Sequence, residues 1–149
     1  MKTLLLAFLT FALFPALSVA HQLPNVLLMA EGRDNIMQNW EVPSKKWASQ
    51  SKWTPTSNTA PPLSIAKAVE LGESWLRRQH SDINKLAVNK VALRTPSQSG
   101  SDARDGWFYS VEFQPIVAGR KFWGGALVVV VLLDGTVVVP RSETYASRR

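Results

Sequence analysis

Cysteine is absent from the 149-residue chain, and histidine occurs only at His21 and His80. The first absence excludes disulfides, thiolate metal sites and a cysteine nucleophile. The second leaves almost no material for a metal site built on imidazole. Glycine is scattered, and Gly124-Gly125 precedes a predicted strand instead of a helix, so the sequence contains no phosphate-binding loop.

Residues suited to catalysis are also scarce. A nucleophilic triad needs a histidine base, and His80, the one histidine in the predicted folded region, lies among cations at a predicted helix end. Asp102 and Asp105 lie in a polar loop beside Arg104, so we interpret them as solvated acids and not as a glycosidase pair. His21 at a mature N-terminus has the groups to bind copper, but that chemistry needs a second histidine. We predict no catalytic residue, no metal and no cofactor.

The first twenty residues have the pattern of a secretory signal peptide. Lys2 supplies the positive charge, Leu4–Phe14 is apolar except for Thr10, and Ser18-Val19-Ala20 provides small residues for cleavage. The apolar stretch is shorter than the roughly 20 residues of a spanning helix. We predict residues 1–20 to be a signal peptide and the mature protein to be periplasmic or extracellular. An uncleaved membrane anchor is the alternative.

Length and charge limit the number of domains and the kinds of partner. A mature chain of this length buries roughly two thirds of its unfolded surface, which is enough for one domain without disulfides. Removal of Lys2 lowers the formal charge from +6 to +5, and the remaining cations are dispersed. Export argues against nucleic acid as a partner. Solubilising charge, or contact with anionic lipid or wall polymer, are the interpretations that remain.

Residues 21–62 are expected to form an irregular extension. Within it, Val26–Ala30 is apolar and Ile36–Val42 shows a weak period of two, which favours short strands. Proline, serine and threonine dominate residues 54–62, a composition typical of an extended linker.

A helix is predicted to begin after Ser64, whose hydroxyl can accept a hydrogen bond from a free backbone N–H of the first turn. Glu73 and Arg77 have the spacing of a favourable ion pair, and Gly72 lies on the apolar side, where it permits close contact with a sheet. The apolar stripe consists of Ile65, Ala68, Val69, Gly72, Trp75 and Leu76.

Four strands are predicted to follow. Leu86–Thr95 is the first; the second, Trp107–Phe113, alternates between an apolar and a more polar face and ends at Pro115. Ala126–Leu133 is apolar on both faces and is therefore placed centrally. Asp134-Gly135 indicates a hairpin to the last strand, Thr136–Val139. The predicted fold is α+β, with one helix packed on a four-stranded antiparallel meander at residues 63–140 and a loose basic tail at 141–149.

Three segments of this pattern resemble the small exported PepSY-like domains within the cystatin-like architecture. They are Leu63-Ser64-Ile65-Ala66-Lys67-Ala68-Val69, Tyr109-Ser110-Val111-Glu112-Phe113 and Asp134-Gly135-Thr136-Val137. The resemblance covers roughly residues 63–140. It implies an exported domain, and some similar domains are thought to restrain proteases.

One further segment is similar to a cystatin motif. Pro115-Ile116-Val117-Ala118-Gly119 resembles the Gln-x-Val-x-Gly loop by which cystatins enter protease clefts. Proline stands where cystatins have glutamine, and the segment follows the second strand after the helix instead of the first. A hairpin connection is the alternative interpretation.

Tryptophan is the most informative residue type. Trp75 and Trp107 fit core positions, whereas Trp40, Trp47 and Trp53 recur in a segment with little apolar company. Exposed indole rings beside cations favour recognition of proteins or sugars. Packing of the extension against the domain is the alternative. The candidate partner-binding residues are Val117, Gly119, Arg120, Lys121, Trp123, Trp47 and Trp53.

Together these observations predict a non-enzymatic exported binding domain. We expect a protein partner, with restraint of a protease as one form of that role. The alternative is a module that binds cell-wall or extracellular polysaccharide through exposed tryptophans.

Overall fold

A computed structural model describes residues 25–33, 35–83, 85–97, 106–117, 120–121 and 125–144. The predicted signal peptide, His21, the loop of Asp102 and Asp105, and residues 145–149 of the predicted tail lie outside the described residues. In chain order the elements are β1 (Asn25–Arg33), β2 (Ile36–Pro43), α1 (Ser44–Ala48), α2 (Ile65–Gln79), β3 (Lys85–Arg94), β4 (Phe108–Val117), β5 (Arg120–Lys121), β6 (Leu127–Leu132), β7 (Val137–Val138) and β8 (Arg141–Thr144).

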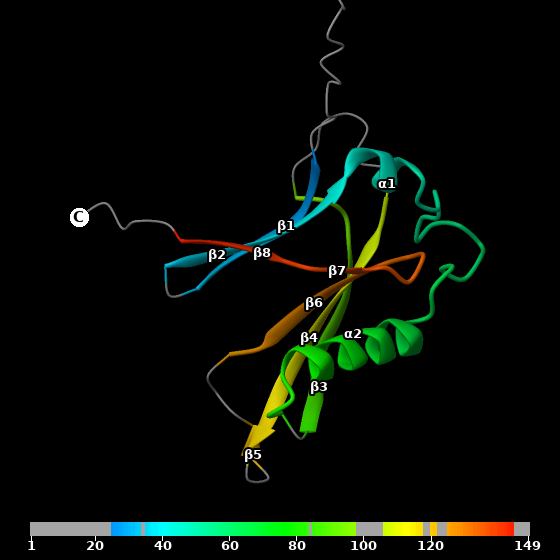
Figure 1. Ribbon diagram of the computed structural model, residues 1–149. Coiled ribbons are helices and arrows are strands. Elements are labelled where there is room, and N and C mark those ends of the chain that lie inside the picture. The colour runs from blue at the N-terminus through cyan, green and yellow to red at the C-terminus, as the bar shows by residue number, and fades with distance from the viewer. Residues whose placement is uncertain are drawn as a thin grey trace, which may run out of the picture.

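The larger of two sheets, called here the large sheet, has the order β3-β4-β6-β7, and β5 pairs with the end of β4. Its neighbouring strands are all antiparallel. Helix α2 lies beside one face of this sheet (Figure 1). The predicted α+β arrangement of a helix on a four-stranded antiparallel meander is therefore confirmed at this level.

Helix α2 begins as its sequence predicts. The hydroxyl of Ser64 accepts a hydrogen bond from the backbone N–H of Lys67 at 3.2 Å, which satisfies one free donor of the first turn. Arg77 donates to Glu73 at 2.6 Å. Gly72 is buried against the large sheet, where a methyl group in place of its hydrogen would lie 3.1 Å from Cε2 of Phe113. The predicted close approach of helix and sheet at Gly72 is confirmed.

The helix-facing side of the large sheet forms one of two hydrophobic clusters. Tyr109, Val111 and Phe113 of β4 are buried there, as the alternation of this strand predicts. The hydroxyl of Tyr109 donates to the carbonyl oxygen of Leu63 at 2.9 Å, which ties the segment before α2 to β4. Hence the start of the helix is fixed by both packing and a hydrogen bond.

The expectation of an irregular N-terminal extension is wrong for residues 25–33 and 35–48, whereas the short strands favoured at Val26–Ala30 and Ile36–Val42 are confirmed. β1 and β2 form an antiparallel hairpin, and β8 adds to β2 to complete a second sheet of order β1-β2-β8, called here the small sheet. β8 also corrects the expectation of a loose tail for residues 141–144. Residues 54–62 contain neither helix nor strand, as expected for the linker.

The small sheet exists because the large sheet has a second apolar face. Phe108 of β4 and Val130 and Leu132 of β6 point away from α2, and they are buried in a second cluster with Trp40 and Val42 of β2. β4 is therefore buried on both faces at this end, and its predicted half-buried character is wrong there. The central position predicted for Ala126–Leu133, with both sides covered, is confirmed for residues 129–133, which are buried. Residues 126–128 are half-buried and lie beyond the part of β6 that pairs with β7.

The two chain reversals predicted at Asp134-Gly135 and at Pro115 have different outcomes. Asp134-Gly135 forms the predicted hairpin, with Gly135 at a φ of 86° and its N–H donating to the carbonyl of Leu132 at 2.9 Å. Pro115, in contrast, does not end β4, because the strand continues to Val117 and Pro115 is paired with Leu86. The cystatin-like segment is thus mostly strand, and its predicted loop character is wrong for residues 115–117.

Candidate functional site

The structure separates the residues that the sequence placed on one binding surface. Val117 pairs with Arg120 in the hairpin between β4 and β5, with Lys121 in the same hairpin. This hairpin and α1, which contains Trp47, lie at opposite ends of the molecule (Figure 1). Gly119 and Trp123 lie outside the described residues. The two predicted halves of the surface therefore do not meet.

Neither Trp47 nor Trp53 is free to recognise a partner. Trp47 is only 3% exposed, because its ring packs in the cluster between the two sheets. Its assignment to a binding surface is therefore wrong. Trp53 is half-buried against the helix-side cluster, and its indole N–H donates to the carbonyl of Thr59 at 2.8 Å. Both indole rings therefore pack the extension against the rest of the domain.

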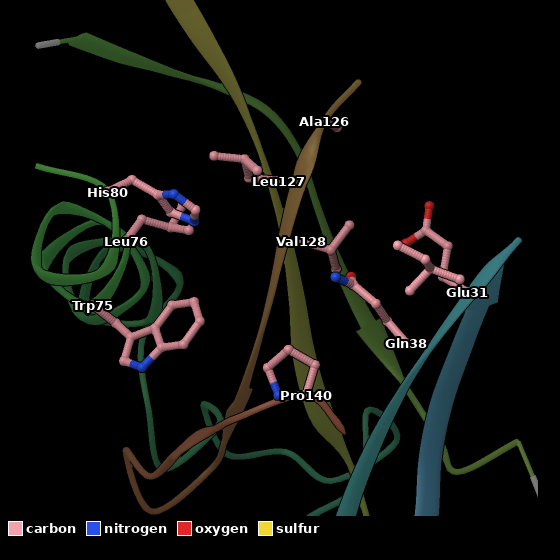
Figure 2. A pocket seen from close by; sticks show the side chains of 10 residues that line it. Glu31, Gln38, Trp75, Leu76, His80, Ala126, Leu127, Val128 and Pro140 are labelled. Carbon is pink, nitrogen blue, oxygen red and sulfur yellow. The ribbon is translucent and has the colours of Figure 1, made fainter. Parts of the chain in front are cut away.

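A cleft lies elsewhere, between α2, the beginning of β6 and the small sheet (Figure 2). Its volume is about 220 Å³. The lining is mainly apolar and comes from four parts of the chain that are separated in sequence: Glu31, Ile36, Gln38, Trp75, Leu76, His80, Ala126, Leu127, Val128 and Pro140.

One wall of the cleft is the C-terminal part of α2. Trp75 and Leu76 belong to the apolar stripe of the helix, and His80 ends the helix with its backbone N–H donating to the carbonyl of Leu76 at 2.8 Å. All three side chains are drawn on this wall in Figure 2. His80 is therefore half-buried beside a cleft, whereas the sequence analysis placed it only at a helix end among cations.

The opposite wall belongs to the small sheet. Ile36 and Gln38 of β2 and Glu31 of β1 line the cleft there, and Gln38 and Glu31 are labelled in Figure 2. Ile36 is 42% exposed although it is apolar, and Glu31 is also exposed. An exposed isoleucine and an exposed carboxylate at a cleft are groups that a ligand can use.

The floor of the cleft is the beginning of β6, where successive side chains point to different layers. Leu127 packs with the helix-side cluster, and Val128 packs with the cluster between the sheets. The cleft therefore opens along an edge of the large sheet, between the layer formed by α2 and the layer formed by the small sheet.

A polar cluster lies at the hairpin between β6 and β7. The carboxylate of Asp134 accepts hydrogen bonds from Lys46, from Gln50 at 3.0 Å and from the backbone N–H of Thr136 at 2.9 Å. Burial by itself would raise the pKa of Asp134, but these hydrogen bonds outweigh burial and lower the pKa below its ordinary range. The cluster joins α1 to the large sheet and is a structural contact.

The cleft was not predicted from the sequence because no single segment contains it. Trp75 was assigned to the core, and Ile36 and Gln38 were assigned to a short strand of the extension with no partner strand identified. Among the described residues, no group of three or more histidine, aspartate or glutamate side chains is placed to hold a metal ion. Within the same ranges, no helix combines the length and apolar composition that a membrane crossing requires.

Comparison with known proteins identifies no relative of the chain. No protein-family model matches the sequence, and neither a curated protein nor a solved structure is significantly similar to the chain.

Proposed function

We propose that the protein is an exported, non-enzymatic binding domain that takes a protein partner in the cleft beside Trp75. The observation that carries the proposal is the largely apolar cleft, which is lined by the half-buried Trp75 and the exposed Ile36. Tryptophan and exposed apolar side chains in a concave site are typical anchors for protein recognition.

The same cleft favours a protein partner over a polysaccharide. Its volume of about 220 Å³ is smaller than the roughly 300–1,000 Å³ of sites that enclose a small ligand, but it accommodates a few side chains of a larger partner. Binding of sugar by stacking requires exposed indole rings. Of the tryptophans predicted to take that role, Trp47 is buried, and Trp53 packs against the helix-side cluster and donates its indole N–H to Thr59. Trp123 lies outside the described residues. Polysaccharide binding remains the alternative function.

For the architecture, we infer a relationship to the cystatin-like and PepSY-like domains. Support comes from the order of one helix followed by four antiparallel strands. The small sheet is an addition to that pattern. Restraint of a protease is one form of the proposed role, and it would use the cleft in place of residues 115–117, which belong to β4.

Site-directed photo-cross-linking in the envelope of the source organism tests the proposal. The photoreactive residue p-benzoylphenylalanine replaces Ile36 in the cleft or, as a control, Val88 on β3. The two side chains are matched, because they are 42% and 45% exposed and both are on strands. We expect one identified protein to cross-link at position 36 and not at position 88.

The identified protein is then purified and its affinity measured. We expect Ile36→Lys to weaken binding by at least about tenfold, because a buried anchor is replaced by a charge. Val88→Lys should leave the affinity unchanged. Equal affinity of both variants would show that the partner binds elsewhere. Retention on wall polymer without any protein cross-link would favour the alternative function.

A further inference from the structure

The floor of the cleft contains an edge of the large sheet that is left open by one proline. β7 pairs with β6 only at Val138 opposite Val130 and at Val137 opposite Val131. If this register continued, Pro140 would lie opposite Val128, but proline has no backbone N–H to donate to the Val128 carbonyl. The chain instead leaves β6 after β7, and Arg141–Thr144 pairs with β2 in the small sheet. The ladder therefore ends before Val128.

The direction of the backbone groups follows from the alternation along a strand. Leu132 donates its N–H to the carbonyl of Thr136 at 2.9 Å, so its backbone points toward β7. Val130 and Val128 lie two and four residues earlier and point the same way. No hydrogen bond joins the Val128 backbone to any described residue on this side. The Val128 N–H and C=O therefore face the cleft.

The two walls of the cleft suit the side chains of an added strand. A residue opposite Val128 would point its side chain toward the small sheet, near Ile36 and Gln38. Its two neighbours would point toward α2, near Trp75 and Leu127. Both layers are visible on either side of β6 in Figure 2. An extended chain with consecutive apolar residues can thus pair its backbone and bury its side chains at once.

Charge at the rim favours a basic residue in that chain. The carboxylate of Glu31 lies on one wall, and the C-terminal end of α2, which carries a partial negative charge, lies on the other wall. The positive charge of Arg77 on this helix is paired with Glu73, and Arg78 is exposed.

On these grounds, and resting on the proposed function, we propose that β6 binds an extended, basic segment of the protein partner as an added β-strand beside Val128. Addition of a strand to an exposed edge is an established mode of peptide recognition. A second copy of the chain is a poor occupant, because its own β6 edge would be equally recessed between α2 and the small sheet. Two recessed edges cannot approach each other.

The experiment uses the whole protein and two probes: the cross-linked partner and the synthetic peptide acetyl-Lys-Thr-Val-Leu-Val-Thr-Lys-amide. Amide hydrogen exchange, measured by NMR, reports directly on the Val128 N–H. In the free protein we expect this amide to exchange much faster than that of Val130, which faces β7. Each probe should slow Val128 exchange by at least about fivefold, the effect of one added hydrogen bond.

Backbone methylation of the peptide separates pairing from simple apolar contact. Each amide is N-methylated in turn, which removes a donor and keeps the side chain. We expect binding to be lost at alternate positions only, because every second amide of a paired strand faces its neighbour. Ile36→Lys should weaken peptide binding, and Val88→Lys serves as the matched control.

The outcomes distinguish this proposal from the function on which it rests. A partner that binds at Ile36 but leaves Val128 exchange unchanged overturns the added strand and keeps the proposed function. Loss of binding at every methylated position, or at none, also overturns the added strand. If no protein cross-links at Ile36 and the peptide leaves the exchange of the Val128 amide unchanged, the added strand and the proposed function are both overturned.

Discussion

The backbone of Gly106 lies against the indole ring of Trp47, so that a methyl group on Gly106 would overlap Cζ2 of Trp47. Trp47 belongs to the short helix α1, and Gly106 lies just before β4 of the large sheet. This contact is one of the places where the N-terminal segment is fitted to the rest of the domain.

Gly106→Ala should therefore destabilise the protein. The methyl group would overlap the ring, and overpacking of this kind costs roughly 1–3 kcal/mol of the free energy of unfolding. Chemical denaturation measures the loss. In a Trp47→Leu background, which removes the ring, the same substitution should cost much less. Equal costs in the two backgrounds would show that the ring is not the obstacle.

The helix and the meander could be predicted because their signals are local. Ser64 begins the helix, alternation identifies the helix-facing side of β4, and Asp134-Gly135 fixes a hairpin. The small sheet could not be predicted in the same way. A bulge between Leu27 and Met29 breaks the alternation of β1, so that Leu28 and Met29 are both buried. The four residues of β8 are all exposed and show no apolar pattern.

The candidate site was harder to predict than the small sheet, because it depends on pairing between distant segments. The predicted last strand, Thr136–Val139, stops before Pro140, but the consequence of this proline for Val128 follows only from the register between β6 and β7. Trp47 was misassigned because its apolar neighbours lie across the chain in β4 and β6. An indole ring in a polar stretch of sequence can be a core residue when a second sheet folds over it.

Tyr109→Phe tests the link between β4 and the segment before α2. The substitution keeps the buried ring but removes the hydrogen bond to Leu63 and leaves that carbonyl without its donor. We expect a loss of about 1 kcal/mol in the free energy of unfolding. Burial raises the pKa of Tyr109 above 10.0, so the protonated hydroxyl stabilises the fold below that pH and this contribution is lost as pH rises beyond it. The variant should show a smaller decline in stability above pH 10.0 than the natural protein.

Asp134 should make the stability of the protein sensitive to acid. Its pKa is lowered in the folded state, so its contribution is present above the ordinary value of 3.8 and is lost as pH falls below it. Asp134→Asn keeps an oxygen for the Thr136 N–H but removes the charge that faces Lys46. Because both side chains reach solvent, we expect a loss of no more than about 1 kcal/mol at neutral pH. Denaturation curves below pH 3.8 should be less pH-dependent for this variant, whereas Asp82→Asn, at an exposed aspartate, should behave like the natural protein.

Tryptophan fluorescence offers a direct report on the cleft. The indole of Trp75 lines it, so a partner that enters should change the polarity around this ring and shift or quench its emission. We expect Trp75→Phe to remove most of the emission change on titration with the purified partner, even where some binding remains. Trp53→Phe is the matched control, since Trp53 also packs against the helix-side cluster but does not line the cleft. The opposite result, a change that survives Trp75→Phe and disappears in Trp53→Phe, would move the binding surface for this partner from the cleft to the segment before α2.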